Sequence, residues 1–380
     1  MTFKASFLKP GQKSSLTNFL ATCFLGLLFV ASSLAQEAQV KNAPARDSQE
    51  KVEVDDVSRS YVVHLPAAYD QQRHYPVVIL LHGQNQDASD MARLTHFNQL
   101  ADRNEIIAVY PNAQHGHWNI GVRPEQASQG TPQRRRGYGR PGGWPGGGGG
   151  YPGGGGGGGY PGGGQGGGQT PDETRNRPEP ADDVAFLNQM LDQLALKYSL
   201  DTRRIYATGL SDGGFMTLRV GCNMADRIAA IAAVGAGMPK TMICLPSRAV
   251  PALFINGTDD PIVPENGGTY KPGRFHVISA EDSAKTWAKF DRCGEKPTQD
   301  KLPSAEKGGK ETKTYTYSGC QSNAQVALYV VRNGGNTWPG GEQYTTEKEV
   351  GKTSNALNAN EAIWNFLVTK KISGESGVEK

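Results

Sequence analysis

This sequence has few cysteines, no long apolar run and no large excess of one charge, because its formal net charge is only +3. Its five cysteines include no CxxC spacing, which argues against a metal site. The apolar run at 19–31 is shorter than the ~20 residues of a membrane-spanning helix, so we expect no stable membrane insertion. Outside residues 123–180 there are 33 basic and 33 acidic side chains, so the globular part indicates no nucleic-acid partner. No metal or organic cofactor is implied, and the oligomeric state is left open.

The N-terminus has the order of residues that is typical of a secretory signal peptide. Three lysines precede the apolar run, and Ser33-Leu34-Ala35 follows it with small side chains suited to cleavage. We expect cleavage after Ala35 and a secreted, extracellular or periplasmic protein. A lipoprotein anchor at Cys23 is disfavoured, because Thr22 precedes the cysteine and little apolar sequence comes before it.

Four cysteines remain after cleavage, and an even number in an exported chain favours disulfides. Three pairings are possible. We prefer Cys222–Cys244 with Cys293–Cys320, because each closes a short loop between neighbours in the sequence. The alternative is four buried free thiols.

Composition divides the chain into five parts. Residues 1–35 are the signal peptide, and 36–50 form an unpatterned leader that we expect to be mobile. Residues 51–121 and 181–370 carry regular apolar patterns, and 371–380 form a tail. Residues 122–180 are rich in Gly, Pro, Arg and Tyr and have too little apolar surface for a core, which predicts disorder. A solvated insertion without a specific partner is our main interpretation. Contact with polymers or surfaces is an alternative, and export argues against RNA binding by its Arg-Gly segments.

Apolar runs alternate with helical periodicity in the patterned parts. Strands separated by helices indicate crossover connections and a mostly parallel sheet with helices on both faces. The chain is therefore predicted to be a single α/β domain. Strands are expected at 60–65, 76–82, 106–110, 204–210, 228–234, 251–256 and 325–331, and helices at about 89–102, 184–198, 214–223, 280–291 and 356–368.

A candidate nucleophile follows the strand at 204–210. Residues 209–214 read GLSDGG, which is a GxSxG motif between a strand and a helix. Glycines relieve the crowding of so sharp a turn, and the helix N-terminus favours developing negative charge. Ser211 is the predicted nucleophile, and the alternative is a plain tight turn.

A second strand end could complete an oxyanion site. Residues 80–84 read LLHGQ, and in a parallel sheet this loop should lie near the serine turn. The backbone N–H groups of Gln84 and Asp212 could then hold an oxyanion. The alternative is an ordinary glycine that ends the strand. We interpret His82 as a structural side chain that bonds its own loop.

A candidate acid follows the strand at 251–256. In this chain order, the aspartate of a Ser–Asp–His triad belongs after a later strand. Asp260 precedes a proline, which keeps it out of the helical region. We therefore prefer Asp260 to its neighbour Asp259, which reads as a solvated turn residue.

Together these motifs resemble the exported poly(3-hydroxybutyrate) depolymerase-like esterases, close to feruloyl and acetyl-xylan esterases, of the α/β-hydrolase fold. The resemblance covers about residues 58–120 and 181–370. It implies ester hydrolysis with Ser211 as nucleophile and Asp260 as acid. The substrate would be a hydroxyalkanoate polyester or oligomer, or a feruloyl or acetyl ester of polysaccharide. The motifs are LLHG at 80–83, ADDVAFL at 181–187, GLSDGG at 209–214, NGTDDPIVPENGG at 256–268 and NGGNTWPGG at 333–341.

The last motif lacks the catalytic base. In the family this loop carries a histidine, and here the position is Asn336. An amide cannot remove the proton from a serine hydroxyl or return it to a leaving alcohol. Asp212 is a smaller departure, because an uncharged asparagine is common there in the family and a carboxylate beside an oxyanion site is unhelpful.

Three interpretations of Asn336 stay open. The chain could be an esterase that uses another base, a degenerate esterase that only binds ligand or adheres to surfaces, or a chain with a recent or erroneous change at this position. His276 follows the acid loop and is the candidate substitute base; a solvated loop histidine is the alternative. His115 and His117 border the insertion and are weaker candidates.

Overall fold

The structure is a computed structural model and describes residues 46–122, 181–270, 272 and 275–373. The chain divides into two compact units, Met1–Ser48 and Gln49–Lys380. The second unit holds the described fold from Gln49 onward. The expected signal peptide, most of the leader, nearly all of the insertion and most of the tail lie outside the described residues.

Among the described residues, ten strands form one sheet in the order β1-β2-β4-β3-β5-β6-β7-β12-β11-β10. The central strands from β4 through β3, β5, β6 and β7 to β12 are parallel, and β2, β11 and β10 pair antiparallel at the two sides. The mostly parallel sheet is therefore confirmed. The strands are β1 Asp47–Val54, β2 Val57–His64, β3 Tyr75–Leu81, β4 Ile107–Pro111, β5 Leu200–Leu210, β6 Ala230–Val234, β7 Ala252–Gly257, β10 Thr298–Leu302, β11 Thr312–Tyr317 and β12 Val326–Val331.

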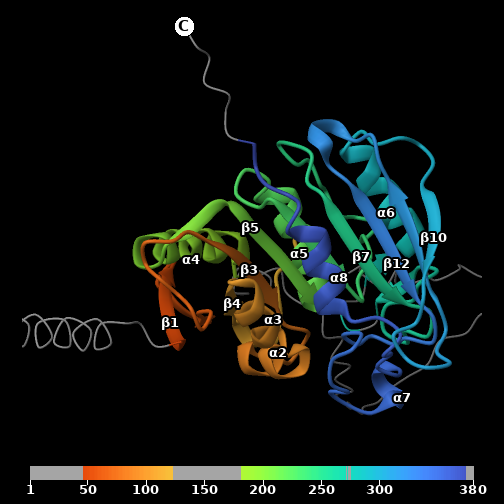
Figure 1. Ribbon diagram of the computed structural model, residues 1–380, viewed down its shortest axis with the longest axis horizontal. Helices are drawn as coiled ribbons and strands as arrows, with labels where there is room; N and C mark the ends of the chain where they lie inside the picture. Colours follow the sequence, from red (N-terminus) through yellow and green to blue (C-terminus); the bar gives the residue numbers. More distant parts are fainter. Residues whose placement is uncertain (1–45, 123–180, 271, 273–274, 374–380) are drawn as a thin grey trace, which may run out of the picture. The chain divides into compact units, whose positions relative to one another are not determined.

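Helices cover both faces of this sheet, as predicted for the α/β-hydrolase fold (Figure 1). One hydrophobic core joins the sheet to α4, α5 and α6, and a second joins it to α2, α3 and α8. Successive side chains of β3 enter the two cores in turn, which explains its fully apolar sequence. The helices are α2 Ala88–Thr95, α3 Phe97–Asn104, α4 Asp183–Lys197, α5 Asp212–Asn223, α6 Ala280–Phe290, α7 Glu347–Val350 and α8 Ala359–Leu367, with 3₁₀ turns η1 Gln114–Gly116 and η2 Gln321–Asn323.

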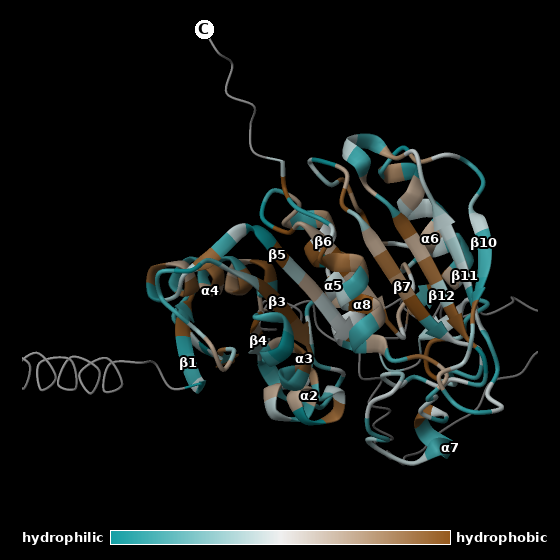
Figure 2. Ribbon diagram, viewed as in Figure 1, coloured by the Kyte–Doolittle hydropathy of each residue, from teal (hydrophilic) through white to brown (hydrophobic). Residues whose placement is uncertain are grey.

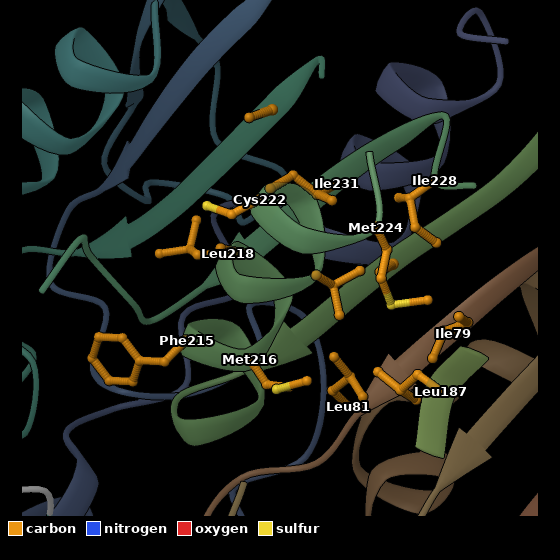
Figure 3. Packing of buried hydrophobic residues seen from close by; sticks show 14 of the residues in the cluster. Ile79, Leu81, Leu187, Phe215, Met216, Leu218, Cys222, Met224, Ile228 and Ile231 are labelled. Carbon is orange, nitrogen blue, oxygen red and sulfur yellow. The ribbon is translucent and has the colours of Figure 1, made fainter. Parts of the chain in front are cut away.

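The helix that starts at the candidate serine is anchored in the first of these cores. Figure 3 shows Met216 of α5 next to Leu81 of β3, with Leu187 of α4 close by, and Phe215 and Leu218 on the other side of the helix. All five side chains are fully buried. In Figure 2 the apolar colour follows the central strands, whereas β10 is hydrophilic and its residues are largely exposed. The turn before α5 is thus held on rigid, packed elements.

The structure departs from the expected elements in a divided helix, an earlier first strand and several unexpected short elements. The single helix expected at 89–102 is two helices, because His96 adopts the left-handed conformation with φ 52° and separates α2 from α3. The first strand begins at Asp47, inside the range expected for a mobile leader, because Val52 and Val54 alternate into the core. The small sheet of β8 Gly268–Tyr270 and β9 Phe275–Val277 was also not expected, and neither were β10, β11 and α7.

Two disulfides link the cysteine pairs preferred from the sequence. Cys222 at the end of α5 is joined to Cys244, and Cys293 after α6 is joined to Cys320. The paired residues are 22 and 27 positions apart in the sequence. Within the described ranges no helix is long and apolar enough to cross a membrane.

Candidate active site

Ser211 lies in the strained turn that its motif predicts. It stands between β5 and α5, with φ 56° and ψ −113°, a conformation that a residue with a side chain rarely adopts. Its backbone N–H donates to the carbonyl oxygen of Val234 at 2.9 Å. A Cβ on Gly213 would lie 2.0 Å from the carbonyl oxygen of Leu81, so the turn packs directly on the end of β3 and requires glycine there.

The two proposed oxyanion donors line one pocket beside this turn. The first N–H groups of a helix have no intrahelical acceptor, so the N–H of Asp212 is available. In the loop after β3, the N–H groups of Asn85 and Gln86 bond to backbone oxygens, and the N–H of Gly83 bonds to the Gln86 side chain; that of Gln84 has no acceptor among the described residues. The pocket has a volume of about 190 Å³ and is lined by Gln84, His117, Trp118, Ile120, Val122, Asp212, Tyr270, Pro272 and Phe275.

The Asp212 carboxyl group is buried beside these donors. Its Oδ2 accepts a hydrogen bond of 2.9 Å from the backbone N–H of Trp118. Burial raises its pKa to about 6, against the smaller lowering effects of this hydrogen bond and of nearby His117. At neutral pH the group is therefore mostly ionised, and its charge opposes a developing oxyanion in the same pocket.

His82 has a structural role in the loop after β3. Its Nε2 accepts from the backbone N–H of Ala113 at 3.0 Å, and its Nδ1 lies 2.7 Å from the carbonyl oxygen of Gly83. Burial lowers its pKa. A neutral imidazole with an Nδ1–H proton satisfies both contacts, and neither nitrogen is left for proton transfer.

Asp260 is held as the acid of a triad would be held. Its Oδ1 accepts from the N–H groups of Ile262 and Val263, both at 2.8 Å, and its Oδ2 faces Asn336. Burial raises its pKa to about 6 against these hydrogen bonds. Asp259 is exposed and bonds to the hydroxyl of Thr258. The structure therefore brings Asp260, and not Asp259, to position 336.

Asn336 occupies a fully buried position in the loop after β12. Its N–H donates to the carbonyl oxygen of Val350 at 2.6 Å, and a Cβ on Gly335 would meet that same oxygen at 2.2 Å. The glycine therefore lets the loop pack tightly enough to fix residue 336. The amide Nδ2 donates to Asp260 Oδ2 at 2.8 Å and to the carbonyl oxygen of Gly235 at 3.1 Å.

The Asn336 amide can perform only one of the two functions of a catalytic imidazole. It supplies the N–H that a triad aspartate accepts, but it has no second nitrogen to take a proton from serine. Its Oδ1 is buried and has no hydrogen-bond partner in the described part of the chain. Both Ser211 and Asn336 are tied to the end of β6, through Val234 and Gly235 respectively.

The remaining candidate histidines lie in different places. His276 in β9 is opposite Thr269 in β8, and its Nε2 lies 3.3 Å from the Thr269 hydroxyl. Side chains alternate along a strand, so His276 projects from the face of the hairpin opposite to Phe275, which lines the pocket. His117 also lines the pocket, whereas His115 lies in the preceding 3₁₀ turn.

Tyr270 is a site residue that no sequence pattern indicated. Its ring packs on Phe215 and Phe275 with centroid distances of 4.8 Å and 5.0 Å. Its hydroxyl group is close enough to Ser211 for a side-chain hydrogen bond to lower the pKa of the phenol. Burial is the largest cause of its raised pKa, followed by the charge of Asp212. Tyrosine after an acid loop has no recognisable motif, and only the β8–β9 hairpin brings it to the serine.

Across the described ranges, no group of three or more His, Cys, Asp or Glu side chains is placed to hold a metal ion.

Comparisons with known proteins relate the chain to esterases. The family described as "Esterase PHB depolymerase" matches residues 59–130. A protein named as the esterase NocK, from Nocardia uniformis subsp. tsuyamanensis, is 26% identical over 337 residues, which are 86% of this chain and 84% of that protein. Feruloyl esterase B from Piromyces equi is 34% identical over 164 residues, which are 41% of this chain but only 29% of that protein.

A solved structure of acetyl xylan esterase from Aspergillus awamori is also similar. The match has 12% identity and a TM-score of 0.46, and it covers 76% of this chain and 94% of that one. Because this score is low, the fold assignment rests on the sheet order and the serine turn described above.

Proposed function

We propose that this chain, which resembles the poly(3-hydroxybutyrate) depolymerase-like and feruloyl-esterase-like esterases, is a serine carboxylic-ester hydrolase with Ser211 as its nucleophile. The supporting observation is the backbone of Ser211, held at φ 56° between β5 and α5. Strain of this kind, about 1–3 kcal/mol, persists only where the surrounding structure enforces it, and it marks functional turns.

The reaction would follow the usual two steps of acyl transfer. Ser211 Oγ attacks the ester carbonyl carbon, and the N–H groups of Gln84 and Asp212 receive the oxyanion. The adduct then expels the alcohol, and water releases the acid from the serine. Asp260 would orient a base, but Asn336 supplies none. Without one, binding and the oxyanion donors leave an acceleration on the order of 10³–10⁴ over water.

The pocket supports a small acyl group. Its wall includes the aromatic side chains of Trp118, Tyr270 and Phe275. Its volume of about 190 Å³ is smaller than a typical drug-sized site, so it suits one acyl unit rather than a polymer segment. A feruloyl, acetyl or single hydroxyalkanoate unit would fit this description. We also propose export, which the two disulfides support.

A ligand-binding protein without turnover is the second candidate. The observation that favours it is Asn336, which bonds to Asp260 in a fully buried position and cannot accept a proton. On this alternative the pocket keeps its affinity for esters but the serine is not deprotonated. Adhesion through the Gly-rich insertion would involve residues outside the described ranges.

Hydrolysis assays separate the two candidates. The substrates are p-nitrophenyl acetate, methyl ferulate and a 3-hydroxybutyrate dimer. We expect slow hydrolysis by the natural protein, its loss in Ser211→Ala, and no change in Ser199→Ala. Ser199 lies just before β5, at the opposite end of this strand from Ser211, and is the matched control.

Two results would count against the esterase proposal. An unchanged rate in Ser211→Ala contradicts the assignment of the nucleophile. Ester binding by the natural protein with no hydrolysis above background supports the binding protein.

A further inference from the structure

The hydroxyl of Tyr270 lies near the Ser211 side chain, and no part of the proposed reaction has used it. Ser211 is close enough for a side-chain hydrogen bond to lower the pKa of the phenol, against the larger raising effect of burial. Tyr270 is 2% exposed, so its hydroxyl is kept from bulk water and depends on polar groups within the site. Its ring is fixed between Phe215 of α5 and Phe275 of β9, which restricts where the hydroxyl can go.

Tyr270 shares its pocket with the two proposed oxyanion donors. It lines the same pocket as Gln84 and Asp212, whereas neither Asp260 nor Asn336 lines that pocket. A carbonyl group bound there would therefore lie among three donors, two backbone N–H groups and one phenol. We propose that Tyr270 is a third oxyanion donor, which hydrogen-bonds the tetrahedral adduct formed at Ser211.

This inference rests on the proposed function and assigns a further residue to it. When Ser211 Oγ bonds to the carbonyl carbon, the electron pair of the C=O double bond moves to the oxygen, and the serine proton goes to solvent. Tyr270 keeps its own proton throughout and donates it in a hydrogen bond to the new anionic oxygen. The raised pKa of Tyr270 agrees with this role, because a donor must stay protonated.

Tyr270 would also offset part of the charge of Asp212. The Asp212 carboxyl lines the pocket and is unfavourable to an oxyanion. A hydrogen bond from a neutral phenol to an anionic oxygen is among the stronger types of hydrogen bond in proteins. The geometry thus points to a site that depends on Tyr270 more than a site with a neutral residue at position 212 would.

Phenylboronic acid provides the test, because it forms an anionic tetrahedral adduct with a serine oxygen and has no leaving group. The titration uses the full-length protein, with benzamide as an uncharged ligand that forms no adduct. We expect Tyr270→Phe to weaken the boronic acid about ten- to a hundredfold, from the strength of one hydrogen bond to a charged oxygen. Benzamide affinity should stay within about twofold, since it places no charge beside the phenol.

Tyr206→Phe is the matched control. It removes a buried phenol hydroxyl that donates to the carbonyl oxygen of Lys370, away from the pocket, and should leave both affinities unchanged. Equal boronic acid affinity in Tyr270→Phe and natural protein overturns the proposal. Equal weakening of both ligands also overturns it, because Tyr270 would then be only a wall of the pocket.

The proposed function fails in a distinguishable way. If Ser211→Ala abolishes boronic acid binding, the nucleophile is supported whatever Tyr270 does. If the natural protein forms no boronate adduct at all, the nucleophile and the role of Tyr270 are both rejected.

Discussion

Replacing Asp212 with asparagine should stabilise the protein at alkaline pH and leave its stability unchanged at acidic pH. Burial raises the pKa of this carboxyl group from 3.8 to about 6 in the folded protein. The folded state therefore binds the proton more tightly than the unfolded state. The contribution of this carboxyl group to the free energy of unfolding is complete below pH 3.8, and it is lost as the pH rises through about 6.

The size of the effect follows from this difference. Each pKa unit corresponds to about 1.36 kcal/mol, so ionisation of Asp212 costs about 3 kcal/mol of stability above pH 6. The introduced amide would stay neutral at every pH, and its oxygen could still accept the hydrogen bond from the N–H of Trp118. The variant should thus exceed the natural protein by about 3 kcal/mol at pH 8, or roughly 6 °C in Tm.

Thermal unfolding at pH 4 and pH 8 measures the difference. Asp260 and Asp291 are also buried with raised pKa values, but they titrate in both proteins and cancel. Asp259→Asn is the control, because it makes the same chemical change at an exposed carboxyl group. A gain of equal size at both pH values, or none at pH 8, would refute the argument from ionisation.

Three further predictions concern stability and the base. Replacing both Cys222 and Cys244 with alanine should lower the free energy of unfolding by about 3 kcal/mol in urea titrations, as expected for a loop of this length; an unchanged midpoint would contradict this. Exchanging residues 123–180 for a short Gly-Ser linker should leave Tm nearly unchanged, because Asn119 on one side already bonds to the first residues after the insertion; a loss of several degrees would show that the segment packs on the domain. His276→Ala should leave the rate of ester hydrolysis unchanged, because its side chain projects from the far face of the β8–β9 hairpin; a lost rate would identify it as the base.

The fold was predictable where buried segments have a continuous or periodic apolar sequence. β3 is apolar at every position because both its faces are covered, and β5 leads directly into a glycine-rich motif. β10 was not predictable, since its residues Thr298–Leu302 are largely exposed and polar, and its pairing with β11 alone makes it a strand. The break at His96 was hidden because apolar residues on both sides of it continue the helical pattern.

Part of the candidate site was predictable from the sequence and part was not. Ser211 and Asp260 follow buried strands of the parallel sheet, so local patterns were enough to expect them at the same end of that sheet. Tyr270 belongs to a three-residue strand with no apolar run, and its contact with Ser211 depends on the fold of the hairpin. The spacing of residues along the chain does not predict that the two residues lie close together.

The kcat of Asn336→His for p-nitrophenyl acetate tests the central claim, that an otherwise complete serine esterase site lacks its base. Residue 336 already donates to Asp260, so an imidazole there would be oriented by the same carboxylate. We expect a gain of at least about a hundredfold over the natural protein, the lower end for a positioned general base. The gain should vanish when Ser211→Ala is added, and Asn336→Gln, which keeps an amide, should show none. A folded Asn336→His protein that is no faster than the natural one would contradict the account.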